Sequence, residues 1–424
     1  MSDLRAKRAI LAALSHVPTF SALAHLPPLD SKAGANCLRW LDQSGLTLFL
    51  FRALQDQGAT DRLSASWRQA LWQRQERNAL RVHDMVEEAK RINSVFLSYG
   101  VTAALLKGFS LAPDFCADLL LRHQVDFDFL VAPEDTRAAA QALSACGYSA
   151  AYINEAGESS FLTPLRHIPS RKDDLYGLQR QRQVDLHVSL WEPTPWLPVE
   201  TPKDCLEQSE MHEIFGFKYR SLSLEDKFLL QVLHAFRHAV RPWIRVSWLL
   251  EISRCMDLHR ENESLWNRVI ARAGNADLIR PIFAFILGLV QRLFQTPIPA
   301  SLCCWTAKAE TARLRAWLEH FGFAWAVSDW PGSINNAFLA GDFIHDAKLR
   351  RQYWRSRLVP KKVNTTLGSV VTYSRTRALQ FQAARIRYIA QRALAHLRDV
   401  AALPRRHFFW KRTLHRCEQI TTER

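Results

Sequence analysis

Two aspartates, two residues apart, are the first residues here whose types and spacing could do chemistry. Asp126 and Asp128 lie in residues 125–131, whose alternating pattern predicts a strand with two different faces. Residues two apart on a strand share a face, so both carboxylates project together while Phe127 and Phe129 point into the core. Such a pair can hold hard divalent cations, which prefer oxygen ligands. The alternative is an amphipathic strand with an acidic solvent face.

A third carboxylate on a later strand would complete the set. Asp185 lies in residues 183–190, another predicted strand, with apolar neighbours on the opposite face. Nucleotidyl transfer needs the triphosphate charge neutralised and a hydroxyl activated, and two Mg²⁺ ions about 3.5–4 Å apart do both. Asp126, Asp128 and Asp185 are therefore candidate magnesium ligands and catalytic residues. Asp185 is also the candidate general base, and His187 a supporting group.

Groups that could meet a phosphate precede the Asp-x-Asp strand. Residues 101–106 predict a short strand ending at Lys107 and Gly108, and residues 109–111 can open a helix. The free N–H groups of a helix start favour a phosphate, as would Ser110 beside them. Lys107 adds a point charge, and Arg122 supplies a fork for a phosphate oxygen. The alternatives are a solvated strand end for Lys107 and a surface cation for Arg122.

The surrounding elements predict an α+β protein with a small mixed-sheet core flanked by helical regions. Periodicity divides the chain into an N-terminal helical region (1–95), an α/β core (96–222), a helical domain (223–347) and a basic, largely helical C-terminal segment (348–424). Within the core, Pro133 opens a helix that Gly147 ends, and residues 147–153 predict a further strand. The polar stretch 155–182 either closes over substrate or is a surface loop.

The order of these motifs resembles the uncharacterised nucleotidyltransferase family of the polymerase-beta-like superfamily. The resemblance covers about residues 90–260, with Gly108-Phe109-Ser110 in place of the superfamily's usual Gly-Ser or Gly-Gly pair. The matching positions are Lys107-Gly108, Arg122, Asp126, Asp128, Gly147-Tyr148 and Asp185-Leu186-His187.

This resemblance implies a nucleotidyltransferase core and a magnesium-dependent reaction. The reaction would move a nucleoside monophosphate from an NTP donor to a hydroxyl-bearing acceptor and release pyrophosphate. The alternative is a catalytically silent protein that binds a nucleotide or partner and docks on a membrane or polyanion through its basic tail.

Two histidines lie on one face of a helix that begins at Ser223 with an acid three residues on. His234 and His238 are four apart, so they lie on the same side of that helix. They are candidate cleft residues that contact metal, nucleotide or acceptor. The alternative is a pair of structural histidines or a solvated face.

The basic charge is concentrated at the C-terminus. Residues 348–424 hold 19 Lys and Arg against three Asp and Glu, a net charge of +16, so the rest of the chain is close to neutral. Residues 379–400 repeat apolar side chains at helical spacing among arginines. The segment predicts an anionic contact, with a membrane surface, nucleic acid or an acidic partner as candidates. The alternative is a helix that packs its apolar stripe on the body.

Length and composition bound the remaining possibilities. A chain of 424 residues suggests two or three domains, and 48% apolar with 23% charged residues is typical of a soluble globular protein. No run approaches the roughly 18 apolar residues of a spanning helix, and the N-terminus lacks a signal-peptide pattern. We expect a cytoplasmic protein, with the inner membrane face as a peripheral location. Eight scattered cysteines predict reduced thiols without disulfides.

Overall fold

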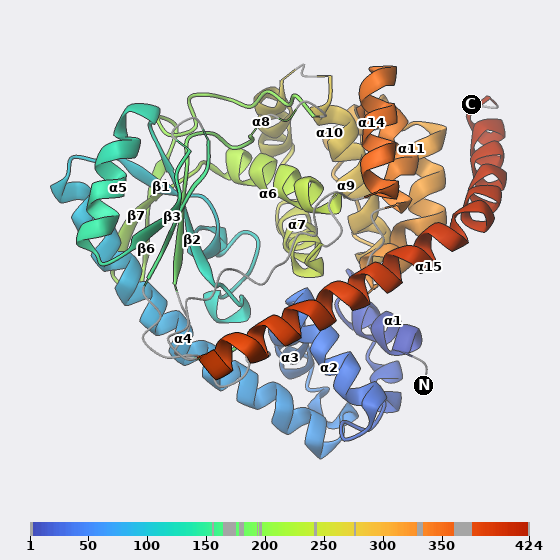
Figure 1. Ribbon diagram of the computed structural model, residues 1–424, viewed down its shortest axis with the longest axis horizontal. Coiled ribbons are helices and arrows are strands. Elements are labelled where there is room, and N and C mark those ends of the chain that lie inside the picture. Colours follow the sequence, from blue (N-terminus) through green and yellow to red (C-terminus); the bar gives the residue numbers. More distant parts are fainter. Residues whose placement is uncertain are drawn as a thin grey trace. The chain divides into compact units, whose positions relative to one another are not determined.

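A computed structural model (Figure 1) shows two compact units. Unit 1 contains Met1–Pro193, Val199–Phe236 and Arg245–Ala309, and unit 2 contains Thr194–Pro198, Arg237–Ile244 and Glu310–Arg424. The segment 155–182, the predicted substrate loop, lies mostly outside the described residues. Those are 3–154, 157–163, 175–177, 182–192, 194, 197–240, 244–274, 277–328, 334–359 and 375–422.

In the described part of unit 1, seven strands form one mixed sheet in the order β3-β4-β5-β2-β1-β7-β6. The central β2 runs antiparallel to β1 and parallel to β5, and β1 runs parallel to β7. The predicted strands β1, β2, β3 and β5 are confirmed, whereas β4, β6 and β7 were not predicted. Their bounds are β1 Ala103–Leu105, β2 Asp126–Val131, β3 Ser149–Tyr152, β4 Ser159–Leu162, β5 Gln183–His187, β6 Glu210–Ile214 and β7 Phe217–Ser221.

The core of unit 1 lies between the sheet and two helices, α4 (Ala65–Ser98) and α5 (Thr136–Ala145), which lie on the same side of the sheet in Figure 1. Phe127 and Phe129 are buried in this core, and the ring of Phe129 packs edge-on against Phe96 of α4 at 5.2 Å. Each fully buried Phe side chain contributes about 1.5–3 kcal/mol. Because side chains alternate along a strand, this packing fixes the opposite face of β2 for the aspartates.

Helices make up the rest of unit 1. The predicted start of α6 is confirmed, because Ser223 Oγ accepts a hydrogen bond from the Asp226 backbone N–H at 3.3 Å. The last residues of α6 belong to unit 2. The helix bounds are α1 Asp3–Ala13, α2 Lys32–Ser44, α3 Thr47–Asp56, α6 Leu224–Ala239, α7 Val246–Leu258, α8 Glu263–Ala273, α9 Ile279–Phe294 and α10 Ala300–Ala307.

Helices predominate in the described residues of unit 2. Its longest helix, α15, contains Pro404 and changes direction in its C-terminal third (Figure 1), as expected where proline removes a backbone hydrogen bond. Its C-terminal part packs on α11, while Ile386 and Leu397 of the predicted apolar stripe are 65% and 64% exposed. The bounds are α11 Ala312–Trp317, α12 Phe323–Ala326, α13 Ala340–Phe343, α14 Ala347–Leu358 and α15 Arg375–Thr422.

Two further properties concern the described residues. None of their helices combines the length and the apolar character needed to cross a membrane. All eight cysteines are free thiols; Cys303 and Cys304 are exposed, Cys146 is half-buried and the other five are buried.

Candidate functional site

The structure brings the three predicted aspartates together on the sheet face opposite the core. Asp126 and Asp128 lie on β2, and Asp185 lies on the parallel neighbour β5 directly beside Asp128 in register. Adjacent strands are about 4.8 Å apart, and register partners on parallel strands project from the same face. Asp128 and Asp185 are buried and Asp126 is half-buried. We call these three residues the acidic cluster.

Asp128 is the best-compensated member of the acidic cluster. Lys107, which follows β1, donates from Nζ to Asp128 Oδ1 at 2.8 Å, and His187 Nε2 lies 3.1 Å from the same oxygen. Burial opposes ionisation of Asp128, but Lys107 and His187 outweigh it and hold the pKa of this carboxyl well below its usual range. Asp128 is therefore a carboxylate with one oxygen occupied by two nitrogen donors.

The other two carboxyls are less well compensated. Burial, and then the charge of Asp128, raises the pKa of Asp126 to about 6. The same two causes raise the pKa of Asp185, although Gln183 donates from Nε2 to both of its oxygens at 3.0 and 2.9 Å. Lys107 and Arg122 offset the charge of Asp126 only in part, and a bound cation would relieve the imbalance that remains.

The raised pKa of Asp126 predicts a pH dependence of stability. Between the ordinary value of 3.8 and about 6, the folded protein holds a proton that the unfolded chain has lost. Stability therefore falls as the pH rises through this window, by about 2–3 kcal/mol for this group. In metal-free buffer, the free energy of unfolding of Asp126→Asn should exceed that of the native protein by an amount that grows from pH 4 to pH 6. A difference that stays constant from pH 4 to pH 6 contradicts the prediction.

The acidic cluster fits a hard divalent cation by donor chemistry but is not arranged around one. Carboxylate oxygens are the donors that Mg²⁺ prefers. Among the described residues, however, no group of three or more His, Cys, Asp or Glu side chains is placed so that it could hold a metal ion. The contacts give the reason: Asp128 is turned to Lys107 and His187, and Asp185 to Gln183.

The predicted helix start after Lys107 is wrong. Gly108–Leu111 is a single 3₁₀ turn, too short to provide a helix dipole. It ends because Pro113 favours an extended backbone at Ala112, and because Phe109 is anchored in the core against Phe127. Ser110 is buried as well, with no hydrogen-bond partner for its Oγ among the described residues.

Gly108 is required by both its backbone and its neighbour. Its φ is +71°, and a Cβ would lie 2.3 Å from Nε2 of Gln124, whose amide donates to the Asp126 carbonyl at 2.7 Å. We expect Gly108→Ala to lower the free energy of unfolding by about 1–3 kcal/mol in urea titrations, because it adds strain at a positive φ and displaces Gln124. Gly100 also has a positive φ but open space around it, so Gly100→Ala should cost less. Equal losses would mean that Gln124 plays no part.

Arg122 lies in a buried ion pair that sequence analysis missed. Its Nε donates to Glu251 Oε1 of α7 at 2.9 Å, and Gln231 Nε2 of α6 donates to the other oxygen at 3.3 Å. Glu251 is fully buried. Burial lowers the pKa of Arg122, but the charge of Glu251 and the hydrogen bond to it, together with the charges of Cys116 and Asp126, outweigh burial, and the net shift is upward. The signal in the sequence is a single acid within the apolar run 248–252.

A second arginine lies near Arg122 and was also missed. Arg245 precedes α7, and burial, followed by the charge of Arg122, lowers its pKa. The charge of Asp126 acts on both arginines. Arg245 Nη2 lies 3.3 Å from His123 Nδ1, while its Nε is buried without a hydrogen-bond partner among the described residues. Two guanidinium groups beside the acidic cluster suit an anionic ligand.

The two predicted cleft histidines differ in their surroundings. His234 is half-buried, and its ring packs edge-on against Trp248 of α7 with centroids 4.4 Å apart. This is the packing that the structural alternative describes. His238 is half-buried in the last turn of α6, which belongs to unit 2. A cleft role for either residue stays a prediction.

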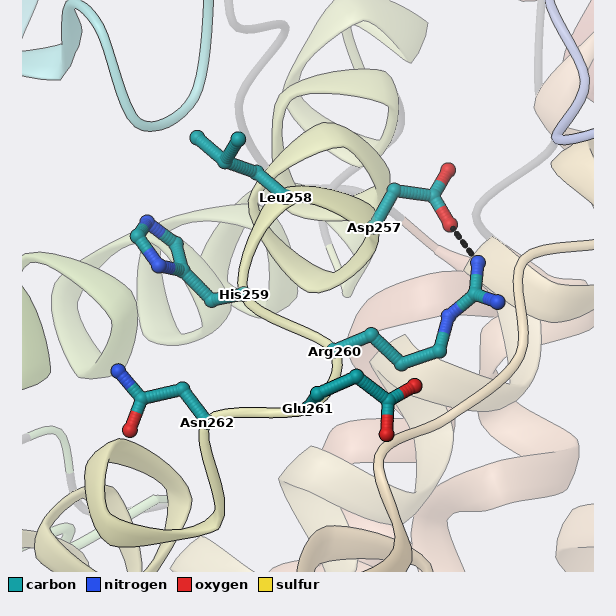
Figure 2. Close-up of a pocket in the computed structure, with 6 residues that line it drawn as sticks. All are labelled: Asp257, Leu258, His259, Arg260, Glu261 and Asn262. Atoms are coloured by element: carbon teal, nitrogen blue, oxygen red, sulfur yellow. Dashed lines mark hydrogen bonds and ion pairs between the residues drawn. The ribbon is translucent and has the colours of Figure 1, made fainter.

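Cavity volume does not lead to the acidic cluster. A cavity of about 640 Å³ is lined by residues 257–262 at the end of α7 (Figure 2). Figure 2 shows Asp257 turned toward Arg260, 2.9 Å away, and His259 directed to the other side. His259 Nε2 lies 2.9 Å from an oxygen of Asp114. None of the predicted site residues lines this cavity.

The fold and the acidic cluster together define an α+β protein of nucleotidyltransferase type. The chain belongs to the uncharacterised nucleotidyltransferase family, whose family model matches residues 33–295, more than half of its length. The match contains all of the predicted site residues and extends beyond both ends of the segment on which the resemblance rested. A search of curated proteins found no match, and neither did a search of solved structures.

Proposed function

We propose that this protein is a magnesium-dependent nucleotidyltransferase that moves an NMP group from an NTP to a hydroxyl-bearing acceptor. The observation that carries the proposal is the acidic cluster on β2 and β5, with Lys107 beside it, inside the segment that matches the family. Asp126, Asp128 and Asp185 would hold Mg²⁺, which when bound neutralises triphosphate charge and lowers the pKa of the attacking hydroxyl. The nitrogen donors that now occupy these carboxylates would be exchanged for the cation.

The protein's own residues divide the remaining work. The acceptor oxygen forms a bond to the α-phosphorus, the bond from the α-phosphorus to the bridging oxygen breaks, and pyrophosphate leaves. Asp185 accepts the acceptor proton, a role favoured by its raised pKa. Lys107, Arg122 and Arg245 would bind phosphate oxygens. We assign no phosphate contact to Gly108 and Ser110, because both are buried in the 3₁₀ turn.

The test is nucleotide turnover by the purified full-length protein. Each of the four NTPs, labelled at the α-phosphate, is incubated with the protein, Mg²⁺ and a fractionated lysate that supplies acceptors. We expect label to enter one class of acceptor, with stoichiometric release of pyrophosphate that EDTA abolishes. Absence of both label transfer and magnesium-dependent NTP binding would contradict the proposal.

The alternative is a catalytically silent protein that binds a nucleotide or partner. The occupied carboxylate of Asp128 and the absence of a helix start at Gly108 favour it. It predicts NTP binding without pyrophosphate release, and docking of the basic segment 348–424 on a membrane or polyanion. Turnover therefore separates the two functions.

A further inference from the structure

Unit 2 contains a cavity of its own, which we call the unit-2 pocket. Its volume is about 400 Å³, and it is framed by α14, α15 and the start of α11. Aromatic and cationic side chains make up most of its wall. Its principal residues are Arg313, Phe338, Arg350, Trp354, His407 and Trp410.

The aromatic residues provide a flat, partly open lining. Phe338 and Trp410 are buried at the base, with ring centroids 4.9 Å apart. Trp354 is half-buried and meets Phe338 edge-on at 5.5 Å, whereas His407 is exposed and stacks on Phe338 at 5.9 Å. The rings of Trp354 and His407 are thus the ones that a ligand could reach, and a planar group is what such walls stack.

The polar groups of the pocket favour an anion. The guanidinium group of Arg313 lies over the ring of Trp410 at 5.5 Å and pairs with Asp342 at 3.6 Å. Arg350 donates from Nη1 to the Ile344 carbonyl at 3.3 Å and keeps further N–H groups for a ligand. The indole Nε1 of Trp410 is buried, with no hydrogen-bond partner among the described residues. An unused buried donor beside two arginines suits an oxygen-bearing ligand.

We propose that the unit-2 pocket binds one nucleotide of a single-stranded nucleic acid. The base stacks on the ring of Trp354 and meets the nearly perpendicular ring of His407 edge-on, and the adjoining phosphate pairs with Arg313 and Arg350. The net charge of +16 on residues 348–424 supplies contacts for the flanking phosphates. A saturated lipid headgroup has no planar ring that could stack on the aromatic side chains of the pocket. The chemistry of the pocket therefore favours a nucleotide over a membrane.

This proposal is independent of the acidic cluster, because every residue that lines the unit-2 pocket belongs to unit 2. The Asp126→Asn variant should therefore bind nucleic acid as the native protein does. Failure of nucleotidyl transfer leaves the pocket proposal intact, and loss of pocket binding leaves the transferase proposal intact.

The experiment measures binding of the full-length protein to a short fluorescein-labelled oligoadenylate by fluorescence anisotropy. We expect Arg350→Gln and Trp354→Leu each to raise the dissociation constant about fivefold or more, the loss of one stacked or paired group. The matched controls are Arg351→Gln, an exposed arginine next along α14, and Phe408→Leu, an exposed ring on α15. Both control variants should raise the dissociation constant less than twofold, as expected when a contact outside the pocket is lost.

Three results would overturn the proposal. Equal losses in the pocket variants and their controls would mean that the basic tail binds by charge alone. AMP binding as tightly as the oligoadenylate would assign the pocket to a free nucleotide. A third arm measures binding to vesicles of phosphatidylcholine and phosphatidylglycerol. If Trp354→Leu weakens binding to the vesicles but not to the oligonucleotide, the unit-2 pocket binds a membrane. If Trp354→Leu unfolds at a lower temperature than the native protein, the comparison of Arg350→Gln with Arg351→Gln decides whether the pocket binds the oligonucleotide.

Discussion

Asp128→Asn should reduce NMP transfer about 10³-fold or more, because several kcal/mol of transition-state charge stabilisation depend on this carboxylate. Three strands bring groups to Asp128. It lies on β2, Asp185 of β5 lies beside it in register, and Lys107, which follows β1, donates a hydrogen bond to it. The measurement is the initial rate of pyrophosphate release at saturating NTP. Glu134→Gln, which neutralises an exposed carboxylate just beyond the same strand, should keep the native rate.

The stability of two neighbouring variants separates a functional from a structural loss. Asp128→Asn leaves the Lys107 ammonium without its counter-charge and should lower the free energy of unfolding by about 1–3 kcal/mol. Asp126→Asn removes a less well compensated charge and should raise it at pH 7. We expect both variants to lose transfer while their stabilities move in opposite directions. An Asp126→Asn variant that is more stable and fully active would remove Asp126 from the site.

The part of the site that sequence could predict depends on local pattern. Alternation along residues 125–131 gives a strand and its two faces, which is enough to put Asp126 and Asp128 together opposite Phe127. These features follow from the two-residue period of a strand, which the sequence states directly. Alternation also predicts a strand at Asp185, whereas the position of Asp185 beside Asp128 depends on the pairing of β2 with β5, which the period does not give.

The missed features depend on contacts between distant segments. Glu251 is 129 residues from Arg122, and no periodicity connects the two. The turn after Lys107 was misjudged because its conformation is set by the burial of Phe109 against Phe127 and by Pro113, and not by helix propensity. Strands β4, β6 and β7, which lie toward the two edges of the sheet, were missed as well.

Glu251→Ala should be the most destabilising single change near the site, by about 3–5 kcal/mol, because it strands the Arg122 guanidinium in a buried position. It also removes the acceptor of the Gln231 amide at 3.3 Å. The measurement is urea unfolding followed by tryptophan fluorescence. The control is Arg268→Ala, which breaks an exposed pair with Glu225 and should cost about 1 kcal/mol or less.

The double variant Arg122→Met/Glu251→Leu tests whether the buried ion pair has a structural role or a role in NTP binding. Replacing both charges by apolar side chains of similar size should restore most of the stability, since neither charge remains uncompensated. If Arg122 binds a phosphate oxygen in addition to Glu251, the double variant should fold like the native protein and still bind NTP weakly. Recovery of stability and NTP binding together would make the pair a structural device that holds α7 against the segment before β2. The difference between these two results decides whether the buried guanidinium belongs to the scaffold or to the reaction.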